Sequence, residues 1–163
     1  MLLAIAIEPA IAPTEEVRGL VGELEGILSA EYTPEQRHGL AIEAIFQPHI
    51  RFFLARSDGA AVGCGGVALF PDFAEVKRMY VRAAARGSGV ADALLERIEH
   101  AARDAGLQLL RLETGVRSYA AIRFYERSGF VRCAAFGAYA TMTAAAIVTS
   151  VFYEKKLTGE ATR

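Results

Sequence analysis

The chain has 163 residues, 53% of them hydrophobic, and its formal net charge is -1. This is enough for one domain with a sizeable core, so we expect residues 1–163 to form a single domain. A chain so close to neutral is not expected to bind nucleic acid. The two cysteines and three histidines show no spacing typical of a disulfide framework or a metal site. We therefore expect no metal, and we expect Cys64 and Cys133 to be buried and reduced.

The N-terminal segment does not have the pattern of a secretory signal. Residues 2–7 are apolar, but no basic residue precedes them and Glu8-Pro9 follow at once, so they are predicted to form a strand. Residues 138–150 carry no charge and are too few to cross a bilayer. We expect a cytoplasmic protein without a membrane segment.

The first half of the chain is predicted to contain two helices followed by three antiparallel strands. Thr14, followed by two glutamates, caps a helix to about residue 30. The sequence Thr-Pro-Glu-Gln at residues 33–36 has the form of a capping box and predicts a second helix to about residue 46. The strands are predicted at residues 50–56, 61–70 and 73–81, the first two joined by the Ser-Asp-Gly turn at 57–59 and the last two by Pro-Asp at 71–72.

The second half is predicted to alternate helices and strands. Apolar residues at helical spacing, closed by Gly106, predict a helix over 89–105. The remaining elements are predicted as a strand at 109–114, a helix at 118–128, and strands at 130–134 and 150–156. A helix between the strands at 73–81 and 109–114 is typical of a parallel pair within an otherwise antiparallel sheet.

The most informative stretch is residues 75–91, where a strand runs through a glycine turn directly into a helix. Gly87 and Gly89 remove side chains where the backbone could approach a ligand closely. A helix that begins near Gly89 leaves its first N–H groups unpaired and presents the positive end of its dipole. This turn therefore favours an anion, although two glycines before a helix are also common in simple turns.

Two well-known phosphate-binding patterns do not fit this turn. The dinucleotide pattern Gly-x-Gly-x-x-Gly has Asp92 at its last position, and a carboxylate pointing inward there would face a pyrophosphate unfavourably. The nucleoside triphosphate loop needs Lys followed by Ser or Thr, and Val90-Ala91 stand there instead.

Four basic residues cluster around the turn, namely Lys77, Arg78, Arg82 and Arg86. Such a cluster beside a glycine loop suits phosphate groups. Each of these side chains could alternatively belong to a solvated, charged strand edge.

The turn has the pattern Arg86-x-x-Gly89-x-Ala91 directly after a strand that ends in Met-Tyr-Val. This resembles the acyl-CoA-binding motif of the GNAT superfamily of N-acetyltransferases, in which Arg or Gln is followed by two residues, Gly, one residue, and Gly or Ala. Residues 121–130, a helix that is closed by Gly-Phe, resemble the second motif of the family. Together these motifs are more specific than either alone, and the resemblance covers about residues 60–157.

The resemblance implies a GNAT-like α/β (α+β) fold and acetyl-CoA as the co-substrate. The fold is a mixed, mostly antiparallel sheet of about six to seven strands flanked by about four helices, in which the parallel pair splays apart and holds the pantetheine arm. The residues expected to bind the cofactor are Met79, Tyr80, Val81, Arg86, Gly87, Ser88, Gly89, Val90, Ala91, Ser118 and Tyr125. Ser118 stands where the family often has Asn or Gln, so it reaches the cofactor through water.

The resemblance also implies that an amine attacks the thioester directly, without a covalent enzyme intermediate. The backbone N–H of Val81 is the candidate for stabilising the oxyanion. Glu75, acting directly or through water, is the best placed base, with Glu113 in reserve, although Glu75 could equally be a surface acid paired with a neighbouring cation. Tyr125 occupies the position of the tyrosine that protonates the departing CoA thiolate, or is simply an amphipathic core residue.

The acceptor is not identified by the sequence. A small-molecule amine, an amino acid or a peptide amine would each fit, in a monomer or a homodimer. Tyr139 and residues 140–149 form one wall of the acceptor pocket or merely a packed connection, and Tyr119 has no assigned role. Two other functions remain open: an acyl-CoA-binding sensor without turnover, and a scaffold domain of the same fold whose last strand pairs with a partner.

Overall fold

The computed structural model describes residues 4–158, which form one seven-stranded sheet in the order β1-β2-β3-β4-β5-β7-β6. All neighbouring strands are antiparallel except β4 and β5, which are parallel. The predicted mixed α/β sheet with a single parallel pair is therefore confirmed. The strands are β1 (Ile5–Pro9), β2 (Ile50–Ser57), β3 (Ala60–Leu69), β4 (Ala74–Val81), β5 (Leu109–Gly115), β6 (Val131–Cys133) and β7 (Ser150–Lys156).

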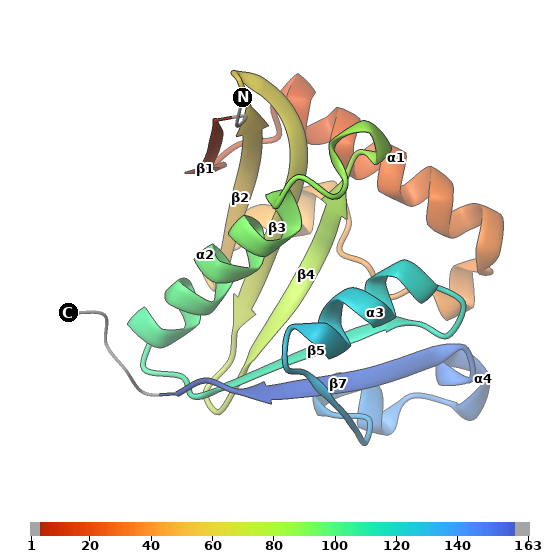
Figure 1. Cartoon of the computed structure of the whole chain (residues 1–163). Coiled ribbons are helices and arrows are strands. Elements are labelled where there is room, and N and C mark those ends of the chain that lie inside the picture. Colours follow the sequence, from red (N-terminus) through yellow and green to blue (C-terminus); the bar gives the residue numbers. More distant parts are fainter. Residues whose placement is uncertain (1–3, 159–163) are drawn as a thin grey trace.

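Four α-helices and four short 3₁₀ turns connect these strands within the described range. The helices are α1 (Glu15–Glu31), α2 (Val90–Asp104), α3 (Tyr119–Arg127) and α4 (Ala144–Ile147). The 3₁₀ turns are η1 (Pro34–Gln36), η2 (Ile42–Phe46), η3 (Ala83–Ala85) and η4 (Gly137–Thr141). Helices α2 and α3 cover one face of the sheet and α1 covers the other (Figure 1).

The alternation of side chains along β2 explains how the sheet holds two hydrophobic layers. Phe53 and Ala55 pack with α2 and α3, whereas Phe52 and Leu54 pack with α1. Successive side chains of a strand point to opposite faces, so one strand serves both cores. Burying each large apolar side chain contributes roughly 1.5–3 kcal/mol, which is why the two layers together hold the helices on the sheet.

The turn between β2 and β3 forms as its sequence predicts. Asp58 and Gly59 both have positive φ, 48° and 87°. Two central residues with positive φ match the right-handed twist of a hairpin, and Asp-Gly is a favoured pair for that conformation. Thr14 likewise caps α1, because its side chain accepts a hydrogen bond from the Val17 N–H at 3.3 Å.

The predicted helix over residues 33–46 is wrong. Gln36 does reach back to accept a hydrogen bond from the Thr33 N–H at 3.0 Å, but only the single turn η1 follows, and η2 begins separately at Ile42. Between them the chain lies against the side chain of Arg78, which donates from Nε to the Leu40 carbonyl oxygen at 2.8 Å. A tertiary contact therefore uses a backbone group that a helix would need.

Smaller differences concern element ends. The first strand spans Ile5–Pro9 rather than residues 2–7, and residues 2 and 3 lie outside the described range. The uncharged stretch after β6 contains η4 and α4. Within residues 4–158, no helix has the length and apolar character needed to span a bilayer.

Strand β4 carries a bulge at Arg78. Lys77 pairs with Gly66 and Tyr80 with Cys64, so β4 advances three residues while β3 advances two. Arg78 has φ of 53°, in the left-handed region that a bulge residue can adopt. The bulge shifts the alternation of side chains along β4 by one residue. The even-numbered side chains before the bulge and the odd-numbered side chains after it therefore face the same core, on the α2 side of the sheet.

The parallel pair β4–β5 separates soon after it begins. Pairing is limited to Ala74 with Leu110 and Glu75 with Arg111. Beyond these residues β4 runs with β3, while β5 follows β7 in a different direction (Figure 1). The splayed pair expected from the family resemblance is present.

Candidate active site

The glycine turn lies between η3 and α2 and is exposed to solvent. Gly87 and Gly89 have φ of 79° and 91°, which an L side chain rarely adopts. A Cβ atom at Gly87 would meet nothing within 4 Å, and at Gly89 only the Ile5 side chain at 3.8 Å. The glycines are therefore required for backbone conformation, and the space beside them is open.

Gly89 is the N-cap of α2, and no side chain forms a capping hydrogen bond there. The first N–H groups of a 15-residue helix thus point to solvent beside a turn that leaves room for a ligand. Such an end can receive a phosphate group through its N–H groups and its dipole. Arg86 lies next to it, and its Nε donates to the Val81 carbonyl oxygen at 3.1 Å.

The prediction that four basic side chains gather at this turn is wrong for three of them. Lys77 pairs with Glu75 at 2.9 Å, Arg78 with Glu25, and Arg82 with Glu23 at 2.8 Å. The last two of these glutamates belong to α1, on the face of the sheet opposite α2. The reason is the strand geometry, since the side chains of β4 are divided between two faces by the alternation and the bulge. Of the four, Arg86 remains at the turn.

The backbone of Val81 is directed away from β3. The Arg82 N–H donates to the Val62 carbonyl oxygen at 2.9 Å, and Val81 lies opposite Gly63. In an antiparallel pair, the residue next to a hydrogen-bonded position turns its own N–H and C=O outward. The Val81 N–H therefore points to the side where β5 has already separated. Met79, Val81 and Ala91 are partly buried against the core on the α2 side.

Tyr125 lies on α3, and its ring packs in the core on the α2 side with Phe124 and Phe130. Burial raises the pKa of the phenol, so the side chain stays protonated at neutral pH. Its hydroxyl has no hydrogen-bond partner among residues 4–158, and the side chain is 6% exposed. The ring is held by packing while the hydroxyl is free to donate.

Glu75 lies on the α1 side of β4 and is 4% exposed. Its Oε2 accepts a hydrogen bond from the Tyr139 hydroxyl at 2.6 Å and forms an ion pair with Lys77 at 2.9 Å. The Lys77 ammonium also donates to the Tyr139 oxygen at 3.0 Å. Burial and then the Glu75 carboxylate raise the pKa of Tyr139. Glu75 is thus paired with Lys77, as the alternative interpretation predicts, but it is buried rather than on the surface, and both of these contacts use one oxygen.

Glu113 on β5 is a second carboxylate on this side of the gap. It accepts a hydrogen bond from the Ser150 hydroxyl at 2.7 Å. Burial raises the pKa of Glu113, and the charge of Glu75 acts in the same direction, whereas the Ser150 hydrogen bond opposes the rise. His38 contributes an opposing positive field, and its ring lies edge-on to Tyr139 with centroids 5.6 Å apart.

Tyr139 is buried among aromatic side chains. Its ring packs against Phe136 and Phe152 at centroid distances of 5.3 Å each. Of the two interpretations left open by the sequence, packing is therefore present, and the hydroxyl also contacts Glu75. The sequence contains no signal for the contact, because Tyr139 follows Glu75 by 64 positions.

The Ser118 hydroxyl already has a hydrogen-bond partner, Tyr32, which the sequence did not single out. The Tyr32 hydroxyl lies 3.2 Å from the Ser118 Oγ and accepts a hydrogen bond from the Arg117 N–H at 3.0 Å. Gly115 makes room for it, because a Cβ there would collide with the Tyr32 hydroxyl. Tyr119, at 63% exposed, contacts nothing that explains its presence.

The cysteines offer no nucleophile. Cys64 is fully buried, and burial raises the pKa of its thiol to about 12. Cys133 is only partly buried, which corrects the expectation for that residue, and both thiols are free. Within residues 4–158, no group of three or more acidic, His or Cys side chains is arranged to hold a metal ion.

Comparisons with known proteins agree with this geometry. Residues 21–130 match the acetyltransferase (GNAT) family. An IAA acetyltransferase of Azospirillum brasilense is 43% identical over 122 residues, which cover 74% of this chain and 80% of that protein. An uncharacterized N-acetyltransferase of Bacillus subtilis is 33% identical, over 87% of this chain and 93% of its own length.

Solved structures show the same fold. A Klebsiella pneumoniae protein assigned as an acyl-CoA N-acyltransferase superposes with a TM-score of 0.74 at 31% identity, covering 94% of this chain and 98% of that one. The PaiA N-acetyltransferase of Thermoplasma acidophilum, solved in complex with coenzyme A, has a TM-score of 0.70 at 18% identity over 94% of this chain and 99% of its own.

Proposed function

Because the chain belongs to the acetyltransferase (GNAT) family, we propose that it transfers an acetyl group from acetyl-CoA to a primary amine by direct attack on the thioester. The observation that carries this proposal is the separation of β4 from β5 beyond Glu75, with the uncapped start of α2 beside it. A gap between two strands offers unpaired backbone groups to an extended ligand, and a helix start offers N–H groups to its phosphates.

The cofactor is proposed to lie along this gap. Its pyrophosphate receives hydrogen bonds from the backbone of residues 86–91, and the pantetheine arm runs along the outward-facing backbone of β4 from Met79 to Val81. This arrangement brings the thioester to the Val81 N–H, which stabilises the oxyanion as the amine attacks. A group positioned in advance in this way adds no reorganisation cost during the reaction.

The acceptor amine is proposed to approach from the α1 side, where the carboxylates lie. An ammonium group must lose a proton before its nitrogen can attack. Glu75 is the proposed base because its Oε2 is held by Tyr139 and Lys77, which leaves Oε1 for the amine proton. Glu113 is the alternative base, and its raised pKa makes its carboxylate a stronger proton acceptor than an ordinary glutamate.

The products form with two further proton transfers. The C–N bond forms as the C–S bond breaks, and the Tyr125 hydroxyl donates its proton to the departing thiolate, yielding free CoA. The new amide nitrogen releases its extra proton to solvent, and solvent then returns a proton to the tyrosine and takes the proton held by the carboxylate base. A phenol whose pKa is raised by burial is protonated at the start of each cycle, as this role requires.

The test combines binding and turnover on the full chain. Acetyl-CoA binding is measured by the rise in melting temperature, and thiol release is measured with small amines, amino acids and peptides as acceptors. Binding together with acceptor-dependent thiol release supports the proposal. Binding without release for every acceptor would leave an acyl-CoA sensor, and absence of binding would leave a scaffold.

A further inference from the structure

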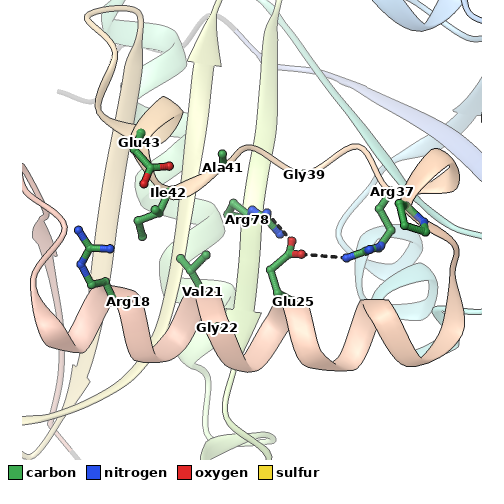
Figure 2. A pocket seen from close by; sticks show the side chains of 11 residues that line it. Arg18, Val21, Gly22, Glu25, Arg37, Gly39, Ala41, Ile42, Glu43 and Arg78 are labelled. Atoms are coloured by element: carbon green, nitrogen blue, oxygen red, sulfur yellow. Dashed lines mark hydrogen bonds and ion pairs between the residues drawn. The ribbon is translucent and has the colours of Figure 1, made fainter.

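A second pocket, separate from the β4–β5 gap, lies between α1 and the segment that contains η1 and η2. It has a volume of about 560 Å³, and its charged lining consists of Arg18, Arg37 and Arg78 with Glu25 and Glu43 (Figure 2). Arg78 enters it from the bulge of β4, Glu25 from α1, and Arg37 from the segment that follows η1 (Figure 2). None of these residues belongs to the site proposed above.

Two buried guanidinium nitrogens, each from an arginine that lines this pocket, have no partner. They are the Nη1 of Arg78 and the Nε of Arg37, each without a hydrogen bond among residues 4–158. The Arg78 side chain is only 4% exposed, so bulk water does not replace the missing acceptor. A buried charged donor without a partner costs free energy, and both such guanidinium groups line the same cavity.

Arg37 and Arg78 share a single counter-ion. Glu25 forms ion pairs with both Arg37, at 3.0 Å, and Arg78. Across the whole lining three arginines face two glutamates, so the pocket keeps a surplus of one positive charge. One unmatched positive charge with two unfilled donors calls for a ligand that carries one negative charge.

The position of Arg78 is fixed before any ligand binds. Its backbone is fixed by the bulge, its Nε donates to the Leu40 carbonyl oxygen at 2.8 Å, and its guanidinium lies under Gly39, where a Cβ would collide with it. A guanidinium whose position is set before binding loses little side-chain entropy when it receives a ligand. Because Nε and Nη2 of Arg78 already contact Leu40 and Glu25, Nη1 is the nitrogen left to donate to a carboxylate oxygen.

We propose that this pocket binds the carboxylate of a small organic acid. Arg78 and Arg37 bind the acid group, and the apolar side chains of Val21 from α1 and Ile42 from η2 contact the rest of the molecule. A phosphate dianion fits less well. The lining has one surplus positive charge, and its two glutamates would repel the second negative charge of the phosphate.

The position of the pocket suggests two sources for the acid. Gly39 touches Arg78, while the neighbouring His38 lies against Tyr139, which binds Glu75. The segment around these residues thus separates the pocket from the proposed base. The carboxylate is therefore either part of the acceptor or belongs to a separate acid that acts on this segment.

The binding test needs no catalysis and is thus independent of the proposed function. The melting temperature of the full chain is measured with phenylacetate, propionate and butyrate, each a monoanion, against the uncharged amide of each. At least one acid is expected to raise it by about 2 °C or more beyond its amide. Arg37→Gln and Arg78→Lys are expected to weaken binding about tenfold, whereas Arg132→Gln, an exposed arginine on β6, leaves it unchanged. Arg37 is 22% exposed, so its variant remains folded even if Arg78→Lys does not.

Turnover then distinguishes the sources. If the acid group belongs to the acceptor, an amino acid exceeds its carboxamide in kcat/KM by tenfold or more, and Arg37→Gln lowers this ratio toward one. If the acid is separate, the carboxylate found above alters turnover of an acceptor without an acid group, and Arg37→Gln abolishes the effect. Equal melting shifts for every acid and its amide, or shifts that survive in both arginine variants, would overturn the proposal.

Discussion

On the face of β4 that packs with α2, the side chains are apolar. The backbone groups that β4 leaves unpaired near Val81 point along the sheet, into the gap toward β5. On the face toward α1, the same strand presents Glu75, Lys77 and Arg78, each in contact with a charged or polar partner. The two faces belong to one strand of eight residues and differ because the side chains alternate. A cofactor common to a family can be held by backbone groups, whereas an acceptor that varies must be distinguished by side chains.

The largest expected effect comes from the apolar side. Tyr125→Phe keeps the ring and its packing but removes the hydroxyl, so stability should change little. If the hydroxyl is the acid, turnover should fall by roughly 10² to 10⁴, about 3–5 kcal/mol of barrier, with little change in acetyl-CoA binding. Steady-state rates and a binding titration measure the two quantities.

A donor with a more acidic thiol leaving group provides the control for Tyr125. Such a thiolate needs less protonation as it departs, so the defect of the Phe variant should shrink with that donor. Equal defects with both donors, or a variant as fast as the parent, would make Tyr125 a packing residue.

The next prediction concerns the face of β4 toward α1. Glu75→Gln keeps the shape of the side chain but cannot take a proton, so turnover should fall about a hundredfold and the acidic limb of the pH–rate profile should flatten. Acetyl-CoA affinity should be unchanged, because the proposed cofactor site consists of backbone groups and does not include the Glu75 side chain. Glu113→Gln is the matched variant, and if it carries the larger loss, the base is Glu113.

The third effect concerns the glycine turn before α2. Saturating acetyl-CoA, at about a hundred times its dissociation constant, should stabilise the fold by roughly 2.7 kcal/mol. Gly89→Val should abolish this shift by adding a branched side chain at the helix start. Gly106→Val, after the other end of α2, is the control, because its φ of 79° imposes similar strain and a Cβ there would meet nothing within 4 Å. A ligand shift that persists in the Gly89 variant would move the cofactor site elsewhere.

The smallest effect is on stability and depends on pH. The pKa of Glu113 is raised in the folded protein, so the folded state binds its proton more tightly than the unfolded state does. As pH rises through that pKa, the ionised carboxylate lowers stability. Glu113→Gln should therefore be more stable than the parent at pH 8, and the advantage should shrink toward pH 4.

Urea unfolding at several pH values measures this difference. Glu96→Gln, which changes an exposed carboxylate on α2, should show no such dependence on pH. A Glu113 variant that is less stable than the parent at pH 8 would mean that the carboxylate is stabilised by its surroundings, contrary to the raised pKa.

The regions that were predicted well are those where local chemistry decides the backbone. The Asp58-Gly59 turn, the Thr14 cap and the start of α2 at Gly89 each depend on residues within a few positions of one another. The helix predicted over 33–46 failed for the opposite reason, since Arg78, some forty positions away, takes the Leu40 carbonyl oxygen.

The sequence by itself determined the order of the strands and of helices α1, α2 and α3, the parallel strand pair and the exposed glycine turn, because periodicity, capping and positive-φ residues are local properties. Only the tertiary structure decided which charges meet. Glu75 with Tyr139, Tyr32 with Ser118, and Arg78 with Glu25 are pairs separated by more than fifty positions. Long-range pairs of this kind depend on strand register and on the bulge in β4, which redirects side chains by a single residue and leaves no local pattern in the sequence.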